Sequence, residues 1–193
     1  MPAITRMCSR AILLNKGTVV EAGPAHEVVN HYLHAGHIQP CAEWPDPAKA
    51  PGNDAVRLRA VRVKSETGQV ADVIDIRSPV RVEIEYDILK PGQTLVAQFG
   101  FNTEEDVIAF IANDRDPQWY RRPRPVGRYV STAWIPGNFL SEGTMVVGGG
   151  IFSEDPWREY CDVPRVVGFR VVDPGTGDTA RGDVTGRWEG VIR

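Results

Sequence analysis

The strongest constraint on the fold is a nine-residue stretch, residues 80–88, in which apolar and charged residues alternate without a break. Its sequence is VRVEIEYDI, with apolar side chains at every even-numbered position and charged ones between them. Successive side chains of a β-strand point to opposite faces of its sheet, so one face of this strand belongs in a core and the other in water. The pattern therefore predicts a strand of an antiparallel sheet that has one solvated face.

Similar short stretches follow one another from residue 55 onward. The first, 55–64, is apolar at Val56, Leu58 and Ala60 and then at Val61 and Val63, and this slip of one residue predicts a β-bulge. Further strands are expected at 95–102, 107–112, 128–135, 144–152, 166–173 and 184–192. Turn residues are frequent and no long helical pattern intervenes, so we predict an all-β fold, an antiparallel β-sandwich of about eight strands.

Residues 1–36 follow a different pattern. Apolar runs at 11–14 and 18–22 flank Asn15-Lys16-Gly17, which predicts a hairpin. Gly23-Pro24 then suits the start of a short helix that ends near Gly36. A hairpin and one helix bury little surface by themselves, so this segment is expected to be a separate region.

Residues 37–54 contain four prolines and no periodicity, which indicates a linker between region 1–36 and a domain at 55–193. Trp44 lies in the middle of this segment, and a bare tryptophan is unusual in a flexible linker. The alternative is an ordered arm that crosses the following domain, and the sequence leaves both possibilities open.

Composition excludes some classes of function. The net charge of −3 and the pI near 5.8 provide no basic field, so neither nucleic acid nor an anionic membrane is an expected partner. The sequence has no membrane-spanning apolar run, and its start lacks the apolar centre of a signal peptide. Cys8, Cys41 and Cys161 lack metal-ligand spacing. We expect a cytoplasmic protein without metal or other cofactor.

The string CSRAILLNKGTVVEAGPAHEVVNHYL, residues 8–33, resembles the end of an ABC-type ATP-binding domain, where a hairpin is followed by a short helix ending in Tyr-Leu. The resemblance implies that region 1–36 is the last segment of such a domain and that the chain begins just after its switch histidine. A phosphate-binding P-loop, G-x-x-x-x-G-K-[ST], occurs nowhere in the sequence. We therefore expect no enzyme activity from this chain, although a full-length parent would be an ATPase.

The remainder resembles the C-terminal extension of ATP-binding subunits that export lipid-linked O-antigen polysaccharides, the Wzt-type proteins. The resemblance lies in the strands 55–64 and 81–87, in Phe99-Gly100-Phe101, and in the stretch IPGNFL at 135–140 followed by Gly143. It implies an immunoglobulin-like sandwich that binds the cargo glycan near its non-reducing end, and a homodimer. It further implies contact with the transporter's membrane subunit through the parent ATPase domain, at the inner face of the inner membrane.

A glycan-binding surface needs exposed aromatic rings for the C–H faces of sugars, and planar donors and acceptors for their hydroxyls. The loop at 113–122 is richest in both, and its candidate glycan-binding residues are Asn113, Asp114, Arg115, Gln118, Trp119, Tyr120 and Arg121. In the alternative interpretation Trp119 or Tyr120 packs into the sandwich and the arginines are simply solvated.

Three further candidates lie elsewhere in the sequence. Trp134 belongs to the strand at 128–135, one side of which must face outward, whereas Trp157 and Tyr160 are assigned to a second loop rich in aromatic and charged residues. Gly148-Gly149-Gly150 allows either close approach by a ligand or packing beneath a bulky neighbour. Trp188 is expected in the core.

Two other functions remain open. The domain could be a structural dimerisation or regulatory extension of the ATPase, with its aromatic residues in a subunit interface. A glycosidase would need two carboxyl groups about 5 to 10 Å apart across a cleft. The adjacent pairs Asp114 with Asp116 and Glu154 with Asp155 suit turn formation better.

Overall fold

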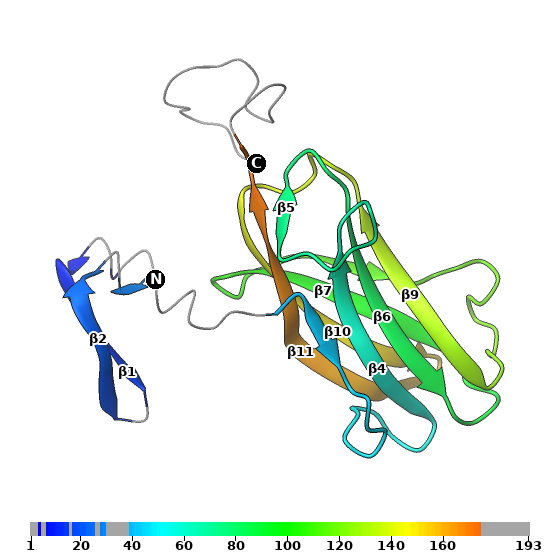
Figure 1. Cartoon of the computed structure of the whole chain (residues 1–193). Helices are drawn as coiled ribbons and strands as arrows, with labels where there is room; N and C mark the ends of the chain where they lie inside the picture. The colour runs from blue at the N-terminus through cyan, green and yellow to red at the C-terminus, as the bar shows by residue number, and fades with distance from the viewer. Residues whose placement is uncertain (1–3, 5–6, 16, 26–27, 30–38, 175–193) are drawn as a thin grey trace. The chain divides into compact units, whose positions relative to one another are not determined.

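The computed structural model describes residues 4, 7–15, 17–25, 28–29 and 39–174. Contacts divide the chain into two units, Met1–His37 and Ile38–Arg193, which are described separately below (Figure 1). No helix in the described ranges is both long and apolar enough to cross a membrane.

The first unit contains the hairpin that the sequence predicts. Strand β1 (Arg10–Asn15) pairs antiparallel with β2 (Thr18–Pro24), with one register shift between Leu13 and Leu14. Of the helix expected after Pro24, only Ala25, Val28 and Val29 are described, and all three are buried. The rest of that helix lies outside the described residues.

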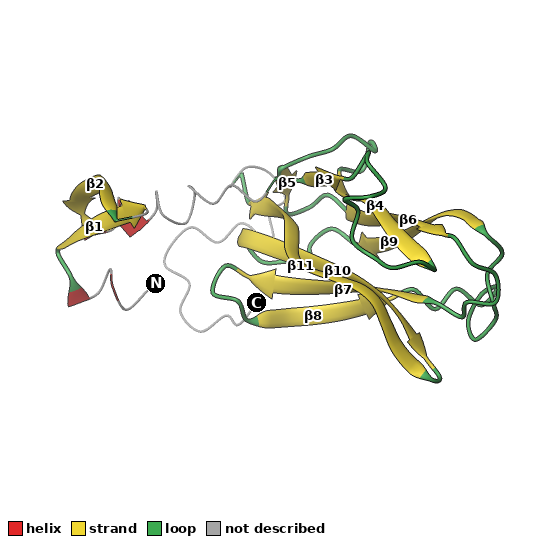
Figure 2. Cartoon of the chain, turned by 90° about the horizontal axis from the view of Figure 1, so that it is seen from below, coloured by secondary structure: helices red, strands yellow, loops and turns green. Residues whose placement is uncertain are grey.

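The second unit consists of two β-sheets packed face to face, as Figure 2 shows. One sheet has four strands in the order β3-β4-β6-β9, and the other has five in the order β5-β11-β10-β7-β8. Their bounds are β3 Cys41–Glu43, β4 Val56–Lys64, β5 Val73–Asp75, β6 Val80–Ile88, β7 Val96–Thr103, β8 Ile108–Asn113, β9 Gly127–Ile135, β10 Gly143–Glu154 and β11 Trp157–Val172. All pairings are antiparallel except that of β5 with β11, so the predicted all-β sandwich is confirmed.

The core lies between the two sheets and is made by the alternating apolar positions of their strands. In β6 the even-numbered residues are buried, as the sequence pattern predicts, with Tyr86 fully buried. The bulge predicted in β4 is also present: Leu58 pairs with Tyr86 and Ala60 with Glu85, so Arg59 is the extra residue. The bulge changes the phase of the strand, and both Ala60 and Val61 are buried as a result.

Three elements differ from the expectation for the second unit. Residues 41–43, within the expected linker, form β3, which pairs with β4, and Trp44 packs against the core, so this part is an ordered arm. Strand β5 was not expected. Strand β11 begins at Trp157 rather than near residue 166, because it continues a long hairpin with β10. The strand expected at 184–192 lies outside the described residues.

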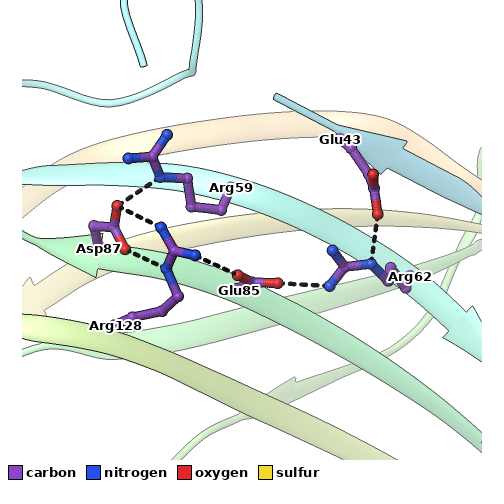
Figure 3. A network of polar contacts seen from close by, with 6 residues as sticks. All are labelled: Glu43, Arg59, Arg62, Glu85, Asp87 and Arg128. Atoms are coloured by element: carbon purple, nitrogen blue, oxygen red, sulfur yellow. Dashed lines mark hydrogen bonds and ion pairs between the residues drawn. The ribbon is translucent and has the colours of Figure 1, made fainter. Parts of the chain in front are cut away.

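The outer face of the four-stranded sheet carries a network of ion pairs (Figure 3). The Asp87 carboxylate accepts hydrogen bonds from Arg59 Nε at 2.5 Å and from Arg128 Nε at 2.8 Å. Arg62 joins Glu85 at 2.6 Å to Glu43 at 2.8 Å, so the network runs from β9 across β6 and β4 to β3. Burial raises the pKa of the Asp87 carboxyl, but the hydrogen bonds from Arg128 and Arg59 outweigh burial and hold that pKa below 3.8.

The chain passes from the four-stranded to the five-stranded sheet at the corner Pro136-Gly137-Asn138, between β9 and β10. A Cβ atom on Gly137 would lie 1.9 Å from the carbonyl oxygen of Arg77, so only glycine fits there. The Asn138 N–H donates to the Ile76 carbonyl at 2.6 Å. These contacts connect the corner to the segment that follows β5.

Candidate functional site

The outer face of the five-stranded sheet is hollowed where β7 and β10 run side by side. Strand β10 directs Val147, Gly149 and Ile151 into the core, so Gly148 and Gly150 face outward. On β7, Gly100 pairs with Gly148 and also faces outward. At these three positions the outer surface of β7 and β10 carries no side chain.

Gly149 differs from its two neighbours. A Cβ atom placed on it would lie 2.8 Å from Ile84 Cδ1, in the opposite sheet, so a larger residue there would have to displace the Ile84 side chain. The structure thus supports the packing interpretation of the triple glycine at Gly149, and the approach of a ligand stays a prediction. Gly149 makes room for a bulky core neighbour, whereas Gly148 and Gly150 line the groove beside the β11 backbone, where added Cβ atoms would lie 3.2 Å from Pro164 Cα and 3.2 Å from Cys161 O.

This surface is a groove of about 360 Å³, bordered by β7, β8, β10 and β11. One row of paired residues crosses all four strands: Asp162 pairs with Gly150, Gly150 with Gln98, and Gln98 with Asn113. Neighbouring strands are about 4.8 Å apart, so Asp162 and Gln98 stand about 10 Å apart on either side of a bare glycine. Of this row, Gln98, Gly150 and Asp162 line the groove, and Asn113 lies beside it. The other lining residues are Gly100, Asn102, Asp106, Ile108, Ile111, Val146, Gly148, Gly149, Pro164 and Arg165.

The polar side chains of the groove are partly held in place by one another. Gln98 Nε2 donates to Asn113 Oδ1 at 3.1 Å, and Asn102 Nδ2 donates to Asp106 Oδ1 at 3.2 Å. Arg165 also bonds Asp106, at 2.9 Å. The Asn102 hydrogen bond and the Arg165 guanidinium both lower the pKa of the Asp106 carboxyl. Positioned amides and carboxylates are suited to bonding a hydroxyl-rich ligand.

Apolar side chains border the same groove. Ile108 and Ile111 on β8 are 62% and 52% exposed, although both are large aliphatic residues. They lie beside Asn102 and Gly100 in the register of β7 with β8. The groove therefore combines an apolar wall with amide and carboxylate groups, the mixture that the two kinds of sugar surface require.

The loop after β8, which holds most of the predicted site residues, is anchored by Asp114. Its carboxylate is turned inward, where it accepts from Ser131 Oγ at 2.5 Å and from Arg124 Nη2 at 3.1 Å. Arg124 is 3% exposed and also bonds the hydroxyl of Tyr86. Burial raises the pKa of the Asp114 carboxyl, but the hydrogen bonds from Ser131, Asp116 N–H and Arg124 bring it below 3.8. Asp114 thus anchors the loop.

The exposed part of this loop lies beside the tip of the β10–β11 hairpin. Arg115 pairs with Glu154 at 2.7 Å, which joins the two segments predicted as candidate loops. The guanidinium groups of Arg115 and Arg121 lie 5.5 and 5.2 Å from the centre of the Tyr120 ring. Trp119 is partly buried and packs edge-on against Tyr129, while Gln118 is exposed.

The three other predicted site residues have different environments. Trp157 is 70% exposed at the hairpin tip. Tyr160 is 7% exposed and its hydroxyl donates to Gln93, so its ring is not available at the surface. Trp134 lies on the four-stranded sheet, with the Arg81 guanidinium 4.5 Å from its ring centre. Trp188 lies outside the described residues.

The structure therefore does not gather the predicted residues into one site. Asn113 lies beside the groove, where it is bonded to Gln98. Arg115, Tyr120 and Arg121 lie in the loop after β8, beside the tip of the β10–β11 hairpin, and Trp134 is on the opposite sheet. Sequence reasoning missed Gln98, Asn102 and Asp162, and the triple glycine is the signal that points to them. Their alignment depends on the pairing of β7, β10 and β11, which a single sequence does not show.

Two other kinds of site, a metal centre and a glycosidase carboxyl pair, can be compared with the described residues. Among them no three His, Cys, Asp or Glu side chains gather as a metal site. In the candidate glycosidase pairs, Asp114 is bonded to Ser131 and Arg124, and Glu154 is bonded to Arg115. The pKa of Asp114 is lowered, whereas a general acid needs a raised one.

No protein-family model and no curated protein matches this sequence. Among solved structures, the chain is similar to a CARDB domain of Pyrococcus furiosus in complex with di-metal ions, with a TM-score of 0.40, 12% identity, and coverage of 68% of this chain and 100% of that one. That likeness is too weak to indicate a shared fold. A second similarity is to the crystal structure of the C-terminal domain of Wzt, with a TM-score of 0.56 and 11% identity over 82% of this chain and 95% of that one. The second unit is thus a sandwich-like all-β domain that resembles the Wzt C-terminal domain in fold.

Proposed function

We propose that this chain is a non-catalytic module that recognises the glycan cargo of an ABC transporter, an O-antigen-like polysaccharide, near its non-reducing end. The glycine-floored groove carries the proposal, because it places amides, a carboxylate and an apolar wall around an open surface. The fold likeness to the Wzt C-terminal domain supports it. So does the resemblance of residues 8–33 to the end of an ATP-binding domain.

The full proposal includes the setting of this module. The second unit is an immunoglobulin-like sandwich that works as a homodimer in the cytoplasm. It is joined to an ATPase domain at the inner face of the inner membrane, and that domain contacts the membrane subunit. The resemblance to Wzt-type exporters is the support for this setting, which needs no cofactor in the binding module.

Binding in such a groove requires no bond to be broken. The C–H face of a sugar would lie against Ile108 and Ile111. Its hydroxyls would exchange hydrogen bonds with Gln98 and Asp162, and with Asn113 beside the groove. An open, wet surface gains little free energy per sugar, so we expect dissociation constants between about micromolar and millimolar.

Filling the groove tests the proposal directly. A Cβ atom on Gly100 meets nothing closer than Asn102 Oδ1 at 4.0 Å, so Gly100→Leu would occupy the groove without disturbing the core. The full chain would be titrated, by calorimetry, with the lipid-free polysaccharide that the source organism exports. We expect binding to weaken at least about tenfold in Gly100→Leu, because a leucine side chain excludes the ligand from the glycine floor.

Thr132→Leu is the matched control, since Thr132 is exposed in β9 on the opposite sheet. It adds the same side chain at a strand position outside the groove, and should leave the affinity unchanged. Absence of any binding by the unaltered chain would contradict the proposed function. Equal weakening in both variants, or in neither, would contradict the assignment of the groove.

The predicted aromatic loops remain a second possible place for the glycan. Trp157 is the best probe, because it is 70% exposed and its removal disturbs little packing. If Tyr120, Arg121 and Trp157 hold the sugar instead, Trp157→Ala weakens binding while Gly100→Leu does not. The pair of variants therefore separates the end of the sandwich from its sheet face.

A structural role in dimerisation is the alternative function, and β9 is the feature that favours it. Among the described strands, β9 forms one edge of its sheet and exposes Val130 and Trp134, which are 54% and 52% accessible. An exposed edge with apolar side chains is a place where a second chain can pair. Under this alternative, Trp134→Glu disperses a dimer in sedimentation experiments, and no polysaccharide binds.

A further inference from the structure

The groove contains an imbalance of charge. Its charged residues are Asp106, Asp162 and Arg165, which leaves an excess of one negative charge. Arg165 is bonded to Asp106 at 2.9 Å, so its charge is already matched. The Asp162 carboxylate makes no hydrogen bond or ion pair with the described residues, and Asp162 is exposed. The free charge of the groove is therefore a carboxylate.

The position of Asp162 directs this carboxylate toward the glycine floor. Asp162 pairs with Gly150, and a Cβ atom on Gly150 would lie 3.4 Å from Asp162 Oδ1. The carboxylate thus leans over the space that a side chain at residue 150 would fill. Gln98 faces the same space from the other side of Gly150.

We propose that the groove selects an uncharged, hydroxyl-rich glycan and discriminates against anionic ones, with Asp162 as the residue that determines this specificity. The inference rests on the proposed function and names the chemical class of its ligand. Two neighbouring sugar hydroxyls can donate to the two oxygens of one carboxylate, and hydrogen bonds to an ionised acceptor are stronger than neutral ones. The Asp162 carboxylate has both oxygens free for this role.

An acidic sugar would be repelled by the same carboxylate. A uronic acid or phosphate would bring a second negative charge beside Asp162, with repulsion that is larger near a protein surface than in bulk water. The arginine that lines the groove, Arg165, is paired with Asp106, whereas the exposed Arg121 and Arg122 belong to the β8–β9 loop and do not line it. An Arg-rich stretch in the sequence therefore does not make the groove itself basic.

The test compares one polysaccharide in two charge states. The lipid-free exported polysaccharide and a sample with its primary hydroxyls oxidised to carboxylates share the same backbone, and both would be titrated into the full chain. We expect the native, neutral polymer to bind about tenfold or more tightly than the oxidised one at low salt. In Asp162→Asn this preference should shrink below about threefold, because the repulsion and the charged acceptor are both removed.

Glu66→Gln is the matched control, since it removes one exposed carboxylate on the turn after β4, outside the groove residues. It should keep the preference of the unaltered chain. Oxidised polymer that binds as tightly as the neutral one, with both lost in Gly100→Leu, would overturn the charge selection and leave the glycan-binding function intact. An unchanged preference in Asp162→Asn would also overturn it, whereas no binding of either polymer would contradict the proposed function itself.

Discussion

The two outer faces of the sandwich are built from similar strands but present different surfaces. On the four-stranded sheet, long charged side chains cover the strands and pair across them, as Arg62 does with Glu85 and Glu43 (Figure 3). On the five-stranded sheet, Gly100, Gly148 and Gly150 leave the backbone bare between polar and apolar walls. Charged side chains that pair with one another have few hydrogen bonds left to offer a ligand. The polar side chains around a hollow can still bind one.

Removing the centre of the ion-pair network should give the largest loss of stability. Asp87 is 9% exposed and bonds both Arg59 and Arg128, so Asp87→Ala leaves two guanidinium groups without their shared partner. We expect unfolding in urea to require about 2 to 3 kcal/mol less free energy. A loss below about 0.5 kcal/mol would show that these ion pairs contribute no more to stability than isolated surface pairs do.

Valine at two glycines distinguishes the inside of the five-stranded sheet from its hollow outside. Gly149→Val places a side chain against Ile84 in the core and should lower the free energy of unfolding by about 1 to 3 kcal/mol. Gly100→Val faces open space and should change it by less than about 0.5 kcal/mol, since valine suits a strand. Urea unfolding of the two variants measures the difference, and equal losses would contradict the assigned orientation of β7 and β10.

Acid should remove the stability that the ion pairs of the four-stranded sheet contribute. The Asp87 carboxyl has a lowered pKa in the folded chain, so its contribution is complete above the unfolded pKa of about 3.9 and is lost as pH falls through the lower folded value. On β5, in the five-stranded sheet, the hydrogen bonds from Arg77 lower the pKa of Asp75 to about 2, so acid removes a contribution from that sheet as well. Unfolding midpoints measured from about pH 5 down to pH 2 should therefore fall, and less steeply in Asp87→Ala. Parallel curves for the two proteins would contradict this origin of the pH dependence.

The edge of the ion-pair network should matter least. Glu43 is exposed on β3, so Glu43→Gln should lower the free energy of unfolding only slightly, and far less than Asp87→Ala does. Because exposed pairs are screened by ions, the effect should disappear near 1 M salt. A loss as large as that of Asp87→Ala would show that the network is coupled along its whole length.

Much of the fold follows from local pattern. The alternation in 80–88 predicts β6 with its buried face, and the slip at Ala60 and Val61 predicts the bulge of β4. Strand β3 was less accessible to prediction, because a three-residue strand between prolines has no periodicity of its own and forms only by pairing with β4. The early start of β11 escaped notice because its hairpin with β10 makes it a strand, despite the charged residues at 158 and 159.

The sequence predicted the kinds of residue that a glycan site needs, but not which residues the structure brings together. A search for aromatic and polar residues that are close in sequence finds the loop after β8, but the structure turns Asp114 inward and packs Trp119 against Tyr129. The groove instead draws Gln98, Gly150 and Asp162 from three strands. The triple glycine marks Gly150, but no local composition marks Gln98 or Asp162, since each is an ordinary residue for its position.

The sequence by itself determined most of the longer strands and which side of β6 and β4 is buried, because alternation acts within a single strand. Only the tertiary structure decided which strands are neighbours, and hence that Asp162, Gly150, Gln98 and Asn113 form one row. It also decided that one outer face is closed by ion pairs and the other open above glycines. The physical reason is that strand register joins residues far apart in the chain, and register is set by the packing of two whole sheets.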